Sequence, residues 1–415
     1  MVLKMRKMKD SGIEWIGEIP EGWEVSQLKY ATRWKSEKGC PDAPVLSLYR
    51  DFGVVPKDSR DDNHNVTSLD TSNYKVVDIG DLVVNKMKAW QGSMAVSDYR
   101  GIVSPAYHVC SITSNKVNKR YLHHLLRNPA YLPDYARLST GMRIGQWDLG
   151  FDDFKNIPFL IPPLDEQAKI ADYLDNSCAS LDAMLSKIRS SIEEYKKLKQ
   201  AVITQAVTKG VCSKREMKDS GVEWIGKINH RFSLIKLKYI CSILDQYRKP
   251  ISADKRSQSG SVLYDYYGAS GAIDKIDDYT IDDHVMLIGE DGANLRMRNL
   301  PLMYEVNGKA WINNHAHILK PTERVDFYYL FYALEGLDIN PYITGSAQPK
   351  LSQENLQNIW VPLPSLEEQQ EIATYIRSKC AEIDRLIAKK EQLVKELESY
   401  KKSLIYEVVT GKREV

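Results

Sequence analysis

Cysteine is sparse in this chain of 415 residues, which carries six, at positions 40, 110, 178, 212, 241 and 380. No two of them form a Cys-x-x-Cys pair, which argues against a zinc site or a disulfide framework and fits a reducing compartment. No apolar run approaches the roughly 18 residues of a transmembrane helix, and the polar N-terminus is unlike a signal peptide. We therefore expect a cytoplasmic protein with no membrane partner.

Motifs of nucleotide and catalytic chemistry are also missing. The chain has no GxxxxGK[ST] loop and no GxGxxG after a strand, so we expect neither ATP hydrolysis nor a bound methyl donor. Residues 128–131, Asn-Pro-Ala-Tyr, are similar to the Asn-Pro-Pro-Tyr motif of adenine methyltransferases, but the third residue differs. The histidines at 64, 108, 315 and 317 lack ligand or triad partners at telling spacings. We therefore expect structural or surface roles for them, and we predict no catalytic residue and no metal site.

Charge is nearly balanced, with 57 Lys and Arg against 55 Asp and Glu. Residues 1–160 carry 22 basic and 19 acidic side chains, and residues 211–360 carry 18 and 19. If such a protein binds nucleic acid, its basic residues must cluster locally, or partner subunits must supply much of the phosphate contact.

One ten-residue stretch occurs twice. Residues 8–17 read Met-Lys-Asp-Ser-Gly-Ile-Glu-Trp-Ile-Gly, and residues 217–226 repeat nine of the ten at a shift of 209. A repeat at fixed spacing predicts duplicated domains. We expect Trp15 and Trp224 to pack at the root of each domain, because the stretch contains no plausible catalytic set.

Each half has the pattern of an α+β domain. The predicted elements are strands at 45–49 and 81–85, strands starting at 28–30 and 237–239, helices at 119–126 and 130–138, and strand–turn–strand segments at 101–109 and 310–318.

Polar loops that combine cationic, amide and aromatic side chains occur in both halves. Such side chains can contact phosphates and base edges, although they also occur in plain connections. The candidate DNA-binding residues are Lys86, Lys88, Trp90, Gln91, Arg143 and Gln146 in the first half, and Arg248, Lys249, Tyr266, Asn294, Arg296, Arg298, Asn313, Gln348 and Lys350 in the second.

Each half then closes with a proline-rich junction and a long helix with apolar residues spaced alternately by four and three. In the second junction, Ser365 and Glu368 have capping-box spacing. The two helices match at a shift of 202, which favours pairing with each other over packing on their own domains. Lys199, Lys390 and Lys401 fall on the seam, where we expect them to extend to its edge or fix the register. The apolar seam residues are Leu181, Leu185, Ile188, Ile192, Tyr195 and Val202 in the first helix and Ile383, Ile387, Val394, Leu397 and Leu404 in the second.

The repeat also predicts the direction of the helices. The first helix leads into the second copy of the repeated stretch, so by symmetry the last helix should end near the first copy. The helices would then be antiparallel, with the two α/β domains separated by them in a circular, pseudo-two-fold layout. The predicted domains are 1–160, a central helical spacer 161–210, 211–360 and a C-terminal helical spacer 361–415.

This layout resembles the specificity subunit of type I restriction–modification systems. The resemblance covers essentially the whole chain and rests on residues 15–23, 162–167, 344–352 and 366–369, arranged around two heptad helices. The second half departs from it in one small motif, because Arg231-Phe232 replaces Gly22-Trp23.

The resemblance implies two target-recognition domains, each reading half of a bipartite target in double-stranded DNA. It also implies two modification subunits that bind S-adenosylmethionine and methylate adenine, and restriction subunits that use ATP and Mg. This chain would then be a non-catalytic subunit with no cofactor of its own. Two alternatives remain, a self-contained adenine-specific DNA methyltransferase or nuclease, and a coiled-coil scaffold with no DNA role.

Overall fold

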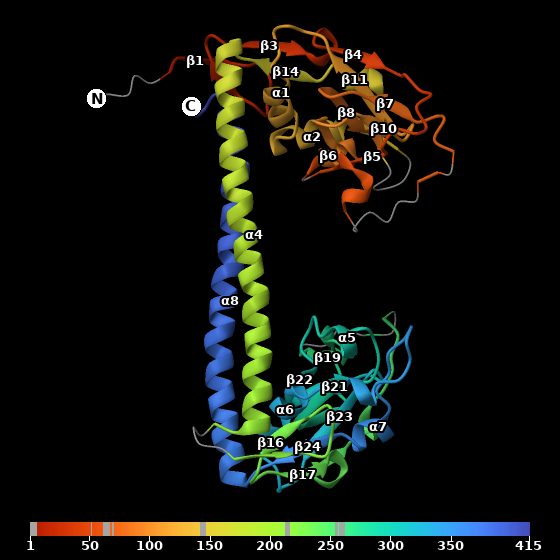
Figure 1. The fold of residues 1–415 in the computed structure, drawn as a ribbon, viewed down its shortest axis with the longest axis vertical. Coiled ribbons are helices and arrows are strands. Elements are labelled where there is room, and N and C mark those ends of the chain that lie inside the picture. The colour runs from red at the N-terminus through yellow and green to blue at the C-terminus, as the bar shows by residue number, and fades with distance from the viewer. Residues whose placement is uncertain are drawn as a thin grey trace, which may run out of the picture. The chain divides into compact units, whose positions relative to one another are not determined.

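Two compact units make up the chain in the computed structural model (Figure 1). Unit 1 comprises Met1–Ile188 and Gln392–Val415, and unit 2 comprises Arg189–Glu391. Each unit therefore contains one globular domain and part of both long helices, α4 (Leu164–Lys209) and α8 (Leu366–Val409). The structure describes residues 6–50, 52–60, 67–68, 70–141, 147–211, 216–253, 256 and 262–415.

The domain of unit 1 is built on a four-stranded antiparallel sheet in the order β4-β11-β8-β9. Strands β7 and β10, β5 and β6, β12 and β13, β3 and β14, and β1 and β2 form separate pairs. The strands are β1 (Met8–Asp10), β2 (Glu18–Pro20), β3 (Glu24–Gln27), β4 (Thr32–Lys35), β5 (Leu46–Tyr49), β6 (Gly53–Pro56), β7 (Lys75–Val77), β8 (Asp81–Asn85), β9 (Met94–Val96), β10 (Gly101–Val103), β11 (Tyr107–Ile112), β12 (Ser139–Thr140), β13 (Asp148–Leu149) and β14 (Pro158–Ile161). The helices are η1 (Leu28–Tyr30), η2 (Lys57–Ser59), η3 (Lys86–Gln91), α1 (Lys119–Leu126), η4 (Pro129–Tyr131), α2 (Leu132–Leu138) and α3 (Phe151–Phe154).

The domain of unit 2 has a larger, six-stranded sheet in the order β18-β23-β21-β22-β19-β20, in which only the β19–β22 pairing is parallel. Strands β17 and β24 and strands β15 and β16 pair separately. The strands are β15 (Met217–Asp219), β16 (Lys227–Asn229), β17 (Ser233–Lys236), β18 (Cys241–Ile243), β19 (Tyr264–Gly268), β20 (Gly271–Ile276), β21 (Ile281–Gly289), β22 (Met303–Ile312), β23 (Ala316–Pro321) and β24 (Trp360–Leu363). The helices are η5 (Leu237–Tyr239), η6 (Asp245–Tyr247), α5 (Asn294–Met297), α6 (Phe327–Gly336), η8 (Asn340–Tyr342) and α7 (Gln353–Gln357).

The frame next to the helices is the same in both units. Strand β3 pairs with β14 in unit 1, and β17 pairs with β24 in unit 2 in the same register. The fold class is thus confirmed as two duplicated α/β domains. Most predicted elements are confirmed as well, including β8, α1 and both strand–turn–strand segments.

The prediction that strands start at residues 28–30 and 237–239 is wrong. Both segments are 3-10 turns, η1 and η5. Leu28 and Leu237 are fully buried in these turns. Each turn leads the chain from one sheet into the next, since β3 pairs with β14 whereas β4 pairs with β11.

The core of each domain includes the helices. In unit 1, Leu174 of α4 and Val408 of α8 belong to the same buried cluster as Trp23 and Leu160 of the domain. In unit 2, Val207 of α4 and a set of α8 residues belong to the domain core in the same way. Burial of these apolar faces stabilises the attachment of each domain to both helices.

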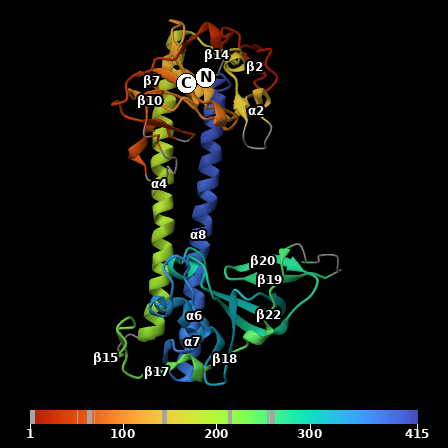
Figure 2. The same cartoon turned by 90° about the vertical axis from the view of Figure 1, so that its right-hand side faces the viewer.

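The helices α4 and α8 pack side by side along the predicted seam (Figures 1 and 2). All the predicted apolar seam residues are buried or half-buried, and Lys390 lies over the ring of Tyr195. Among the described residues, no helix combines the length and apolar character needed to cross a membrane.

Two ion pairs fix the direction of the helix pair. Lys401 contacts Asp182 at 2.6 Å in unit 1, and Lys199 contacts Asp384 at 2.7 Å in unit 2. The second pair repeats the first with the helices exchanged, at the shift of 202. Because residue numbers rise along α4 while those of the partners fall along α8, the helices are antiparallel, as predicted. Two of the three seam lysines therefore set the register.

Candidate nucleic-acid interface

The polar loop of unit 2 is a closed turn. The backbone amide of Thr344 donates to the carbonyl of Lys350, and that of Lys350 donates back to Thr344, at 2.9 and 2.8 Å. Gly345 has a φ of 78°, and a Cβ there would lie 2.4 Å from the carbonyl oxygen of Gln348, so the turn requires glycine. The Arg296 guanidinium donates to the carbonyl of Gly345 at 3.2 Å. The loop is therefore held by its own backbone and by α5.

A chain of charges lies at the base of this loop. Glu290, whose side chain is 14% exposed, contacts both Arg248 and Lys350, the latter at 3.1 Å. Arg248 also contacts Asp245 at 3.1 Å. Burial alone would raise the pKa of Glu290, but the hydrogen bonds from Arg248 and Lys350 outweigh it and lower the pKa. The carboxylate thus stays charged and holds two predicted DNA contacts next to each other.

The predicted residues of unit 2 differ in exposure: some are exposed, two are buried, and Arg248, Asn294 and Arg298 are half-buried. Tyr266 is 1% exposed and its hydroxyl donates to the carbonyl of Ile251, while Asn313 is 6% exposed and accepts from the amide of His315. In this conformation these two side chains support the surface. The exposed set consists of Lys249, Arg296, Gln348 and Lys350.

Asn294 and Arg298 are occupied by contacts that shape the turn after α5. Asn294 donates to the carbonyl of Leu300 and accepts from its amide. Arg298 has a φ of 49° and donates to the carbonyls of Glu335 and Leu337. Burial lowers the pKa of Arg298. Contact of either residue with DNA stays a prediction.

In unit 1 the structure brings η3 next to the ends of the corresponding loop. Lys86 contacts Asp148 at 3.0 Å, and the rings of Trp90 and Trp147 meet edge to face with centroids 5.1 Å apart. Gln91 is half-buried and Lys88 is exposed.

Arg143 and Gln146 lie outside the described residues. The strands that flank their loop, β12 and β13, pair with each other. The two described ends of their loop therefore lie next to each other.

Sequence reasoning missed a cation and an aromatic ring beside Phe151 of α3. The Lys75 ammonium lies 5.0 Å from the ring centroid of Trp34 and donates to the carbonyl of Tyr107 at 2.6 Å. Burial lowers the pKa of Lys75, and Trp34 is 38% exposed. Neither had a sequence signal, because Lys75 and Trp34 belong to separate short strands that only the fold brings together.

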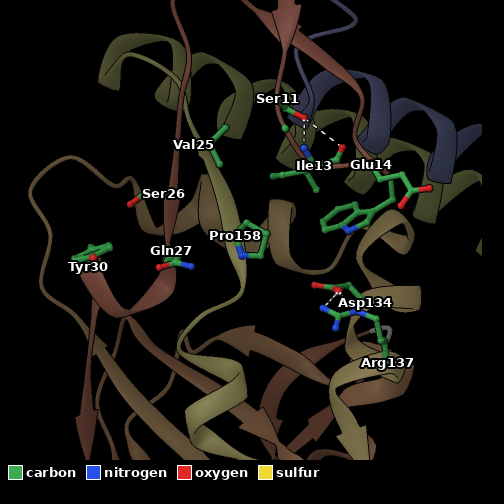
Figure 3. A pocket seen from close by; sticks show the side chains of 12 residues that line it. Ser11, Ile13, Glu14, Val25, Ser26, Gln27, Tyr30, Asp134, Arg137 and Pro158 are labelled. Atoms are coloured by element: carbon green, nitrogen blue, oxygen red, sulfur yellow. Dashed lines mark hydrogen bonds and ion pairs between the residues drawn. The ribbon is translucent and has the colours of Figure 1, made fainter.

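The repeated stretch forms a turn away from these loops. In unit 1, Asp10 and Ser11 accept backbone amides at the turn, and Asp219 and Ser220 do the same in unit 2. A hollow of about 640 Å³ beside the first copy is lined by residues that include Ser11, Asp134 and Arg137 (Figure 3). Trp15 also lines it, and its ring packs on Tyr131. None of the candidate DNA-binding residues lines this hollow.

The two copies of this turn pack unequally. Trp15 is half-buried, whereas Trp224, which meets the ring of Tyr342, is 40% exposed. At the end of α8, Lys412 donates to the carbonyl of Ile16 at 2.8 Å. The predicted meeting of the last helix with the first copy is therefore confirmed within unit 1.

Two loop-bearing domains built on one pair of antiparallel helices define a duplicated nucleic-acid-binding protein. The chain belongs to the family of the type I restriction modification DNA specificity domain, whose model matches residues 20–194 and again 230–398.

Relatives of this family align over nearly the whole chain. The specificity subunit of the type I restriction enzyme MjaVIII from Methanocaldococcus jannaschii is 27% identical over 95% of this chain and 93% of its own. A chain solved in work on complex assembly and conformational transition of the type I R-M system has a TM-score of 0.72 at 15% identity, covering 95% of this chain and 99% of that one. The HsdS subunit of Thermoanaerobacter tengcongensis has a TM-score of 0.51 at 16% identity, covering 95% and 98%. These two structures share the fold.

Proposed function

We propose that this chain is the non-catalytic, sequence-reading subunit of a type I restriction–modification complex. Each domain reads one half of a bipartite target in double-stranded DNA, and the paired helices set the gap between the halves. One observation carries the proposal. In both domains the ends of a polar loop are anchored beside cationic side chains, on the same duplicated frame.

The chemistry of the loops suits base reading. In unit 2 the loop offers an exposed amide, Gln348, and an exposed cation, Lys350, and helix α5 beside it adds the exposed cation Arg296. Amides can pair with adenine and cations with guanine in the major groove, and cations also contact phosphates. With neither domain strongly basic, partner subunits would supply further phosphate contacts.

We further propose that two modification subunits dock on the helices and the adjoining domain faces. Several large apolar side chains on the helices are more than a third exposed, and some of them recur at the shift of 202. A surface that occurs twice suits a partner present in two copies. The recurring pairs are Leu164 with Leu366, Met184 with Leu386, and Leu198 with Tyr400.

The cofactors of the complex would reside in these partners. The modification subunits would bind S-adenosylmethionine, and restriction subunits would use ATP and Mg, in the cytoplasm where the DNA is. The chain itself would act by binding and positioning DNA.

The test is to reconstitute the chain with its modification subunits and map methylated adenines and protected bases on DNA. We expect two short protected stretches with an unread gap, and methylation in both halves. A single continuous footprint would contradict bipartite reading.

A second assay addresses the alternative of a self-contained methyltransferase. The purified chain is incubated with S-adenosylmethionine and DNA without partners, and we expect no methyl transfer. Transfer under these conditions would favour the alternative.

A further inference from the structure

A buried histidine occupies the same place in both domains. His108 lies in β11 opposite Val84 of β8, and His317 lies in β23 opposite Ile288 of β21. The two are 6% and 1% exposed, and they are separated by the shift of 209 that relates the repeated stretches. Both strands lie inside their sheets, so each imidazole is presented by a rigid element.

Each histidine holds the returning end of a polar loop. His108 Nε2 lies 2.9 Å from the carbonyl oxygen of Leu149, and His317 Nε2 lies 2.8 Å from that of Leu351. Both leucines are fully buried and directly follow the loops described above. The same ring atom thus fixes the same backbone carbonyl in two domains whose loops differ in sequence and length.

The surroundings of the two rings differ. His108 packs against Trp34 and Phe151, and its Nδ1 is buried with no hydrogen-bond partner among the described residues. Burial lowers the pKa of His108, so its ring is neutral and Nε2–H donates to Leu149.

In unit 2 the second ring nitrogen is engaged. His317 Nδ1 lies 2.6 Å from Asp245 Oδ2, so both contacts are hydrogen bonds only if both nitrogens carry protons. Asp245 contacts Arg248, Arg248 contacts Glu290, and Glu290 contacts Lys350 at the end of the loop. His317 is therefore connected to the loop in two ways, by its hydrogen bond to the backbone carbonyl of Leu351 and by the chain of charged side chains that ends at Lys350.

We propose that His108 and His317 are positioning residues for base reading. Each sets where its loop meets DNA by holding the carbonyl of Leu149 or Leu351. This inference rests on the proposed function, in which these loops read the two half-sites.

The physical reason is geometric. Hydrogen bonds to base edges require donors placed within about 0.5 Å, whereas attraction to phosphates tolerates larger movement. If the carbonyl loses its buried partner, the end of the loop shifts to find another donor or water. Discrimination between bases should then fall while overall DNA affinity changes little.

The test compares two substitutions of one residue in the full complex with modification subunits. His317→Gln places an amide nitrogen near the position of Nε2 and keeps the bond to Leu351. His317→Asn is shorter, reaches only the position of Nδ1 and loses that bond. Competition binding is measured with duplexes that carry single base-pair changes in either half of the methylation-mapped target.

We expect His317→Asn to lower discrimination about 10-fold in the half read by unit 2, and His317→Gln to stay within about 3-fold of the parent, as for loss or retention of one buried hydrogen bond. Discrimination in the other half should not change, which shows that the complex is folded. Equal loss in both halves, or no difference between the two variants, would overturn the proposal.

A mirrored pair, His108→Asn and His108→Gln, repeats the test in unit 1 and decides the matter if His317→Asn does not assemble. Lys350→Ala separates this inference from the proposed function. If Lys350→Ala relaxes reading of the half-site but His317→Asn does not, the positioning role is refuted. If neither variant changes base discrimination in a complex that still selects its target, this loop does not read the bases, and the proposed function of the loop is refuted.

Discussion

Lengthening both helices by one heptad should widen the gap in the DNA target and leave the bases that are read unchanged. The perturbation duplicates residues 185–191 after Ser191 and residues 385–391 after Glu391. Seven residues preserve the alternation of four and three along the seam, so the helices can still pair. The two insertion points face each other, because the pairs Lys401–Asp182 and Lys199–Asp384 fix the register.

The size of the effect follows from helix geometry. Seven residues lengthen each helix by about 10 Å at roughly 1.5 Å per residue, which corresponds to about three base pairs at roughly 3.4 Å each. Three base pairs also rotate the far half-site by roughly 100° about the DNA axis, at about 10.5 base pairs per turn. We therefore expect weaker binding together with the wider gap.

The assay is mapping of methylated adenines with the reconstituted complex, for the parent chain and the doubly extended chain. The control inserts the heptad in α4 alone, which places seam residues out of register, and should lower thermal stability or prevent assembly. An unchanged gap, or altered half-sites, in a folded double insertion would refute the idea that the helices set the spacing. If the single insertion widened the gap by the same amount, the pairing of the helices would not determine the distance between the half-sites.

Three further predictions concern stability and can be measured by denaturant unfolding of the chain. Lys401→Ala should lower the free energy of unfolding by only about 0.2–1 kcal/mol, and by less at high salt, because its partner Asp182 is 58% exposed. A decrease of several kcal/mol would mean that the ion pair is shielded from solvent. Gln167→Ala should lower the free energy of unfolding by about 1–3 kcal/mol, because the buried amide of Gln167, at the start of α4, forms hydrogen bonds with three backbone groups. An unchanged free energy would show that water replaces the amide. Burial, with Arg127 close by, lowers the pKa of His123 to about 3, so the unfolded chain binds the extra proton first and stability should fall as pH drops from about 6.5 toward 3. His123→Gln should flatten that pH dependence, and an unchanged profile would exclude His123 as its source.

The architecture was predictable because its signals are periodic or repeated. The heptad spacing of α4 and α8 depends only on residues within each helix, and the shift of 202 between matching positions predicts that the two helices pair. The antiparallel direction followed from where the repeated stretch recurs. The error at Leu28–Tyr30 shows the limit of local patterns, since three residues with one buried side chain suit a strand and a 3-10 turn equally.

The composition of the candidate site was less predictable because it depends on partners distant in sequence. Arg248 and Lys350 both appeared as free cations, whereas Glu290 holds them together from another strand end. Tyr266 appeared as a surface aromatic, but the six-stranded sheet buries it. His108 and His317 had no informative neighbours in sequence, because the carbonyls they hold are 41 and 34 residues away along the chain.

The two halves are alike where they attach to the helices and unlike where they meet the proposed target. Gln167 binds the amide of Asn118 at the start of α1, and Gln369 binds the amide of Asp326 at the start of α6 in the same way. The loop anchors, in contrast, use a neutral imidazole in one half and a chain of charges in the other. A bipartite reader needs this division, because a fixed gap requires identical attachment whereas two different half-sites require different loops. The duplicated glutamines should therefore tolerate less change than the loop residues, and substitutions at them should affect both affinity and spacing without altering which bases are read.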